Sequence, residues 1–209
     1  MEGFAQMARP RSKEKEYAIV QAAIPLIASH GTNAPTTAIA AKASVAEGTI
    51  FRYFPNKDEL LNAVYFHLKE SIREAIADGC SPAQPQSIHA RRAWNNYIQW
   101  GLAHPDAGRA LNLLSVSDRI TPENRAASDA FFPDLQKFCE STDRSLLGEH
   151  RPLFLDSVFF SVAGSVMDFA NRHPDRADAF MEVGFRMFWT AVNEADAGQV
   201  TASAPPDSL

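Results

Sequence analysis

The sequence predicts an all-α protein of about nine helices, in which a small N-terminal domain precedes a larger helical body. Apolar residues recur at spacings of three and four along most of the 209 residues, as on the buried face of a helix. No stretch alternates apolar and polar residues around a two-residue hairpin turn, so strands are not expected. Residues 1–57 hold seven Lys or Arg and four Asp or Glu, a net +3, whereas the other 13 basic and 21 acidic residues give −8. A basic N-terminal segment followed by an acidic remainder favours a polyanion as the binding partner of the N-terminal segment.

The first 57 residues contain three predicted helices. The first begins after Ser12, a plausible N-cap, and extends to about residue 31. Its inward residues recur at helical spacing: Tyr17, Val20, Ile24 and Ile27. A short second helix, capped by Thr36 or Thr37, runs to residue 43, and residues 47–53 form a third.

The remaining helices are longer and form the body. Residues 61, 64, 65, 68, 72 and 76 share one face of a long helix that ends at "DGCSPAQPQ". Further helices are expected over these ranges: 87–103, 107–117, 122–148 with a break near Pro133, 152–171 and 175–195. The predicted domains are therefore residues 1–56 and 57–196, followed by a disordered tail, 197–209, that has no aromatic residue.

The composition is that of a globular chain without a membrane segment. It is 45% hydrophobic and 22% charged, and no apolar run is long and uncharged enough to span a bilayer. The two cysteines, Cys80 and Cys139, form no C-x-x-C pattern, so the sequence indicates neither a zinc site nor a disulfide framework. This cysteine usage favours a protein of the reducing cytoplasm. The histidines lack metal-ligand spacing, and no P-loop, G-x-G-x-x-G or G-x-S-x-G motif is present. We expect no metal, no cofactor and no enzymatic activity.

The short helices at 36–43 and 47–53 have the pattern of a helix-turn-helix. Each has about two turns, a turn of about three residues joins them, and the first helix can back them. Residues 47–53 then form the recognition helix, whose leading end must be narrow to enter the major groove. Ala46, Gly48 and Thr49 are small enough, and Gly48 lets the backbone approach phosphate closely.

The predicted DNA contacts combine residues that read bases with residues that hold phosphate. Arg52 can fork onto guanine O6 and N7, and Thr49 offers a hydroxyl and a methyl group. Tyr53 can direct its hydroxyl to a phosphate, and Lys57 places a cation where a helix begins. Gly48 is a further candidate, as are Thr36 and Thr37 at the start of the preceding helix. Arg9, Arg11 and Lys13 form a basic arm that could contact DNA or could equally be a flexible terminus.

Residues 36–61, "TTAIAAKASVAEGTIFRYFPNKDELL", resemble the DNA-binding signature of TetR-type repressors. Similarity to multidrug-responsive members of the family continues in order to about residue 192, through segments such as "WNNYIQWGLAHP" and "MDFANRHPDRA". The resemblance implies a homodimer with one helix-turn-helix per subunit, and a larger helical domain that binds a ligand and forms the dimer interface. Ser44 departs from the family pattern, because it stands in the turn where a Gly is usual. A left-handed turn costs a non-Gly residue roughly 1 kcal/mol.

Helix 152–171 is apolar almost all round, so it must be buried on more than one side. Asp156 stands out on it, and Phe159 and Phe160 follow at helical contact spacing. A carboxylate beside aromatic rings, to which Tyr65 and Trp94 could be added, suits a flat cation. The same residues also have a purely structural interpretation. The aromatic rings can pack in the core, and Asp156 can be an acid in the first turns of a helix, where the helix dipole favours it. The resemblance implies a ligand site at these positions: Tyr65, Trp94, Asp156 and Phe159, with Cys139 nearby.

Helices 152–171 and 175–195 are also expected to form the homodimer interface as a four-helix bundle, with small residues in "SVAGSVM" at 161–167. The sequence thus predicts a repressor that binds a pseudo-palindromic operator and is released by a small, flat aromatic, cationic or amphipathic ligand. A helical ligand-binding or sequestering protein with weak or no specific DNA binding is the alternative. A TetR-type activator is a third possibility.

Overall fold

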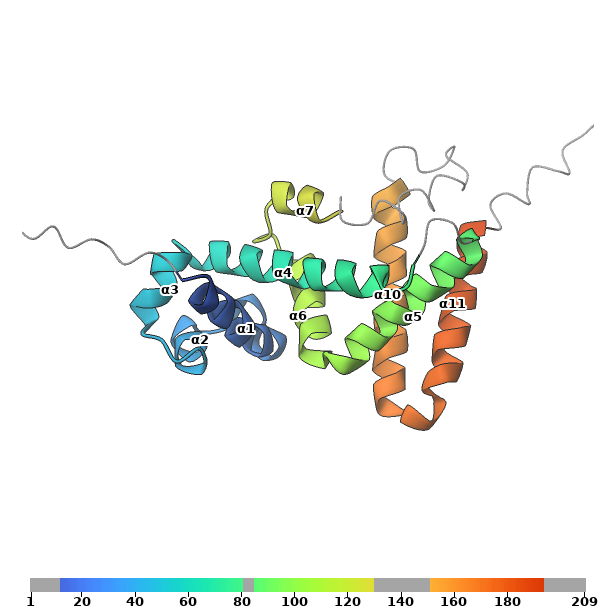
Figure 1. Ribbon diagram of the computed structural model, residues 1–209, viewed down its shortest axis with the longest axis horizontal. Helices are drawn as coiled ribbons and strands as arrows, with labels where there is room; N and C mark the ends of the chain where they lie inside the picture. The colour runs from blue at the N-terminus through green and yellow to red at the C-terminus, as the bar shows by residue number, and fades with distance from the viewer. Residues whose placement is uncertain (1–11, 81–84, 130–150, 194–209) are drawn as a thin grey trace, which may run out of the picture. The chain divides into compact units, whose positions relative to one another are not determined.

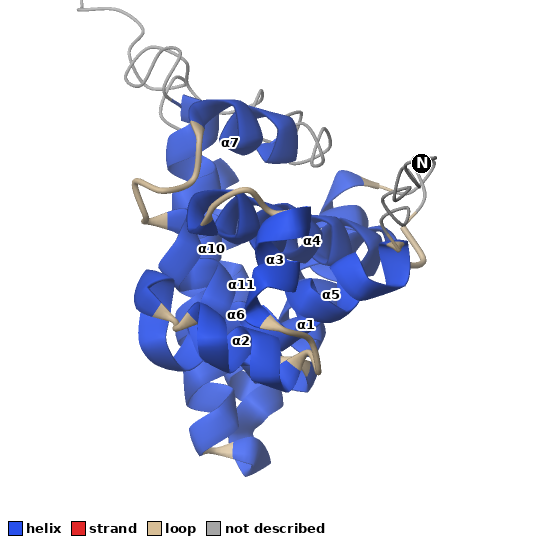
Figure 2. Cartoon of the chain, turned by 90° about the vertical axis from the view of Figure 1, so that its left-hand side faces the viewer, coloured by secondary structure: helices blue, strands red, loops and turns tan. Residues whose placement is uncertain are grey.

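A computed structural model describes residues 12–80, 85–129 and 151–193. These residues form nine α-helices and two short 3-10 helices, and none of them lies in a strand (Figure 2). The predicted all-α class is therefore confirmed. Within these ranges every helix is too short or too polar to cross a bilayer. Four predictions concern residues outside the described ranges: the arm residues Arg9 and Arg11, the break near Pro133, Cys139, and the tail 197–209.

The helices group into two compact units. Within the described residues, the first unit contains 12–70 and 105–128, and the second contains 71–80, 85–104, 129 and 151–193. Helix α4 (Lys57–Ala77) contributes its first part to one unit and its last turns to the other.

The first unit is built around α1 (Figure 1). It contains α1 (Lys13–His30), η1 (Gly31–Asn33), α2 (Thr36–Lys42), α3 (Glu47–Tyr53), the first part of α4, α6 (Pro105–Ser115) and all but the last residue of α7 (Pro122–Asp129). Helix α1 packs against α2 and α6 and buries Val20, Ile24 and Ile27, as predicted. Tyr17 was expected on the same face but is 58% exposed. Residues 13–17 are all exposed, so the first turn of α1 lies beyond the core, and the Tyr17 ring meets His67 edge-on at 5.5 Å.

The second unit is organised by an antiparallel pair of helices. Helices α10 (Arg151–Arg172) and α11 (Ala177–Asn193) are joined by η3 (Pro174–Arg176), and α5 (Gln86–Ala103) packs on both (Figure 1). A glycine permits this close approach, because a Cβ on Gly184 would overlap Val166 and lie 3.0 Å from the Trp94 ring. The α10 bounds agree with the predicted helix 152–171 to within one residue at each end.

Candidate nucleic-acid interface and aromatic cluster

The turn between α2 and α3 has a left-handed residue at the position where the resembling family usually has Gly. Ser44 has a φ of 55°, and among the described residues it is the only non-glycine residue with a positive φ. The turn is closed by the N–H of Val45, which donates to the carbonyl of Ala40 at 3.0 Å. A left-handed serine costs about 1 kcal/mol, and the packing of α2 against α1 and of α3 against α2 can offset that cost.

The start of α2 differs from the prediction that a threonine caps it. Pro35 occupies the N-cap position, and no side chain caps this end. The Thr36 hydroxyl instead donates to the Glu47 carboxylate at 2.5 Å. A hydrogen bond to a charged carboxylate is stronger than one to a neutral acceptor. Since Glu47 is the first residue of α3, this bond connects the start of α2 to the start of α3. Thr37 is exposed.

The outer face of α3 consists of exposed or small residues, while its inner face is apolar. Ile50 and the following Phe54 are buried. Gly48 and Arg52 are exposed and Thr49 is half-buried. A Cβ at Gly48 would meet nothing within 4 Å, so packing inside the chain does not require glycine there. A narrow leading end would instead serve contact with something outside the chain.

Tyr53 has a partner that the sequence did not indicate. Its phenol oxygen accepts a hydrogen bond of 2.9 Å from the backbone N–H of Ser12, which is the N-cap of α1. The hydroxyl hydrogen remains available to donate to a phosphate. The residue immediately after Ser12 is Lys13, an exposed member of the predicted basic arm, so this bond joins the recognition helix to the base of that arm.

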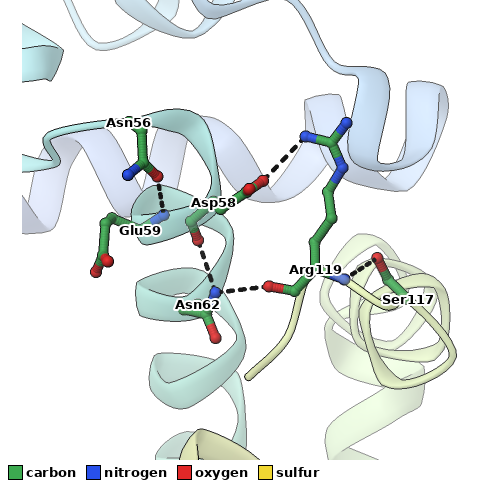
Figure 3. Close-up of polar contacts among 6 residues, drawn as sticks. All are labelled: Asn56, Asp58, Glu59, Asn62, Ser117 and Arg119. Atoms are coloured by element: carbon green, nitrogen blue, oxygen red, sulfur yellow. Dashed lines mark hydrogen bonds and ion pairs between the residues drawn. The ribbon is translucent and has the colours of Figure 1, made fainter. Parts of the chain in front are cut away.

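Lys57 begins α4, as predicted, and lies in a cluster of charges. The Asn56 side chain caps the helix by accepting the N–H of Glu59 at 2.9 Å. Partial burial lowers the pKa of Lys57, the Arg119 guanidinium lowers it further, and Asp58 raises it in part. Arg119 itself forms an ion pair with Asp58 at 3.0 Å (Figure 3). Sequence reasoning missed Arg119, because it follows α6, far from the helix-turn-helix in the chain.

The structure brings Trp94 and Phe159 together in the second unit. Their ring centroids lie 5.5 Å apart, edge to face, and Phe188 stacks on Trp94 at 6.2 Å. Trp94 is fully buried, and its indole N–H donates to the carbonyl of Met181 at 3.0 Å. Tyr97 packs on Phe159 at 5.6 Å, and burial raises the pKa of its phenol. Trp94, Phe159 and Tyr97 are all buried, as core residues are.

The other residues predicted to bind the ligand are Tyr65, Asp156 and Cys139. Tyr65 is buried in the first unit, where its hydroxyl accepts a 3.3 Å hydrogen bond from Ser128. Asp156 lies on α10, but its side chain is outside the described part, as is the whole of Cys139. Over the ranges 12–80, 85–129 and 151–193, no group of three or more His, Cys, Asp or Glu could hold a metal ion.

Comparison with known proteins connects this geometry to one family. Residues 19–64, from α1 into α4, match the model of "Bacterial regulatory proteins, tetR family". A TetR-family transcription regulator from Marinobacter aquaeolei VT8 is 24% identical with a TM-score of 0.72, and 85% of this chain and 94% of that chain are covered. A TetR-type regulator from Shewanella sp. PV-4 is also 24% identical, with a TM-score of 0.71 and coverage of 87% and 98%.

The TetR-like regulator LfrR from Mycobacterium smegmatis, solved in complex with proflavine, is 20% identical with a TM-score of 0.60. The match covers 92% of this chain and 100% of that chain. The likeness to solved structures shows the fold, and the family model matches residues 19–64 only.

Proposed function

We propose that this chain is a ligand-responsive transcriptional repressor that binds a pseudo-palindromic operator as a homodimer in the cytoplasm. The observation that carries the proposal is the helix-turn-helix of α2 and α3, whose outer face presents Gly48 and Arg52 to solvent. The match of the same segment to the TetR-type DNA-binding domain supports it.

In this proposal the DNA contacts have two kinds of role. Arg52 reads a guanine edge, and Gly48 and Thr49 allow α3 to enter the major groove. Tyr53 and Lys57 hold phosphates and set the register of the domain on the duplex. Further backbone contacts come from Thr36, Thr37 and the arm residues Arg9, Arg11 and Lys13.

The dimer is proposed to form through α10 and α11. Large apolar side chains are exposed on both helices: Phe154, Phe169, Val183 and Met187. Exposed apolar surface on two adjacent helices favours a protein partner, and a second copy would complete a four-helix bundle. Residues 57–196 then serve ligand binding and dimerisation, and residues 1–56 serve DNA binding.

The ligand is proposed to be a small, flat aromatic compound, cationic or amphipathic. Trp94 and Phe159 supply aromatic faces, and Asp156 on the same helix as Phe159 supplies a carboxylate that would select a cation. Proflavine, a flat cation, is bound by LfrR. Residues 7 to about 192 resemble the multidrug-responsive TetR-type repressor RamR, which favours Tyr65 and Cys139 as further contacts. Because Trp94 and Phe159 are packed in a core, we expect ligand binding to displace neighbouring rings.

Ligand and operator compete through the state of the dimer. A ligand that favours a dimer whose recognition helices no longer match the half-site spacing weakens operator binding. The coupling is reciprocal, so the operator must weaken ligand binding by the same factor.

A footprint on the DNA that flanks the gene for this chain tests the proposal. A protected palindrome supports a regulator, and loss of protection on adding proflavine supports a repressor released by a flat cation. Salt-sensitive binding that is uniform over all sequences would instead favour the alternative, a helical ligand-binding or sequestering protein without specific DNA binding.

A further inference from the structure

Asn62 on α4 fastens the segment after α6 to the first turns of α4. Its side-chain nitrogen donates to the carbonyls of Asp58 and Arg119, both at 2.8 Å (Figure 3). Its side-chain oxygen accepts the N–H of Thr121 at 3.0 Å and the side-chain amide of Asn124 at 2.8 Å. An asparagine side chain offers two donors and two lone pairs, so all four are used. Asn62 is only 5% exposed, and breaking such a buried network is costly.

The consequence is that Arg119 has a fixed place beside the start of α4. Its guanidinium meets the Asp58 carboxylate at 3.0 Å, next in the chain to Lys57. The side chains of Arg119 and Asp58 are 43% and 58% exposed, and an ion pair so exposed contributes little to stability. The pair therefore does not explain why a buried asparagine should hold this particular backbone segment.

Two positive charges stand beside the same carboxylate, because Arg119 pairs with Asp58 at 3.0 Å and Lys57 directly precedes Asp58 in the chain. The Arg119 guanidinium is near enough to Lys57 to contribute to the lowered pKa of that lysine. Asp58 offsets the repulsion only in part. A guanidinium has five N–H donors, and in the described contacts the Arg119 side chain uses one of them, toward Asp58. A second anion beside Lys57 could therefore bind both cations.

We propose that Arg119 is a further phosphate-binding residue of the DNA interface, held by Asn62 over the same stretch of DNA backbone as Lys57. The inference rests on the proposed function, because it requires the chain to bind DNA through α3 and the start of α4. An arginine fork matches the geometry of a phosphate. Since phosphate contacts carry no sequence information, Arg119 would add affinity equally for operator and for other DNA.

The test measures the salt dependence of binding to the footprinted operator fragment and to a mixed-sequence duplex. Arg119→Gln should lower the slope of log K against log salt by about 1 and weaken both duplexes alike, about threefold or more. Arg109→Gln removes the same charge from another exposed position of the first unit and should leave the slope unchanged. An unchanged slope for Arg119→Gln, or an equal loss for Arg109→Gln, would overturn the proposal.

A second comparison separates phosphate binding from mere neutralisation of Asp58. If Arg119 only screens Asp58 from DNA, Arg119→Gln should have no effect in the Asp58→Asn background. If Arg119 binds phosphate, the same loss of slope should persist in that background. Wild-type protein that lacks any operator preference would refute the proposed function itself, whereas operator preference with a silent Arg119→Gln would refute only this inference.

Discussion

The backbone N–H of Ser12 and the phenol oxygen of Tyr53 form a 2.9 Å hydrogen bond that joins the start of α1 to the end of the recognition helix α3. The bond is partly buried and spans 41 positions of the chain. It places the last turn of α3 relative to the helix that backs it, so Tyr53 has a structural role beside the phosphate contact proposed for it.

Tyr53→Phe should therefore reduce the free energy of unfolding by about 1 kcal/mol, because the Ser12 N–H loses its acceptor. Operator affinity should also fall. Tyr17→Phe is the matched control, since the Tyr17 ring contact with His67 survives the change. Urea denaturation of both variants gives the comparison, and equal stability of the two would contradict the role of the Ser12 bond.

Arg52→Ala and Lys57→Ala should lose operator affinity in different ways. The Arg52 variant should lose about 1–3 kcal/mol and relax the preference at one operator position. The Lys57 variant should bind all sequences more weakly and show a salt slope reduced by about 1. Titrations with operator, with single-base variants and with random duplex distinguish the two. An Arg52→Ala loss of the same size on random DNA would disprove base reading.

Met187→Glu should convert the dimer into monomers without unfolding them. Met187 is 62% exposed on α11, so the charge is tolerated by the single chain but not in an apolar interface. Operator binding should fall with dimerisation, because one half-site is too weak alone. Val116→Glu, at a residue 83% exposed outside α10 and α11, is the control. An intact Met187→Glu dimer in sedimentation would move the interface elsewhere.

Asp156→Asn should weaken proflavine about tenfold, because a charged hydrogen-bond partner becomes neutral. A neutral aromatic such as 2-naphthol should be affected little, and operator affinity without ligand should stay the same. Phe159 needs a mild change, Phe159→Leu, since Phe159→Ala in the core would cost about 3–5 kcal/mol. That variant should weaken both ligands. Calorimetric titration showing equal losses for both ligands in Asp156→Asn would remove its charge-selective role.

Tyr97 should make stability fall at high pH. Its phenol is 2% exposed, and burial raises its pKa above the ordinary 10.0. The protonated phenol is thus favoured in the folded state, so its contribution is complete below pH 10 and is lost as the pH rises further. Relative to Tyr97→Phe, wild-type protein should lose up to about 1.4 kcal/mol per pH unit above pH 10. Parallel stability curves for the two proteins would contradict the shift.

Much of the local structure was determined by the sequence alone. The helical spacing of Val20, Ile24 and Ile27 predicts their burial, because the face that a residue occupies depends on the helical period. The helix start at Lys57 was likewise predicted from local pattern, whereas the left-handed turn at Ser44 was expected from the resemblance to a family that usually has Gly there. For the same reason the location of the helix-turn-helix could be read from a short stretch of residues.

The tertiary structure decided which side chains meet. It exposed Tyr17 although its spacing matched the core, because the first turn of α1 lies beyond the packed helices. It paired Ser12 with Tyr53 and Arg119 with Asp58, and it placed Trp94 against Phe159. Such pairs join residues tens of positions apart, and they depend on which helices pack together and in what register. A periodic pattern specifies the buried face of each helix but leaves its partner open.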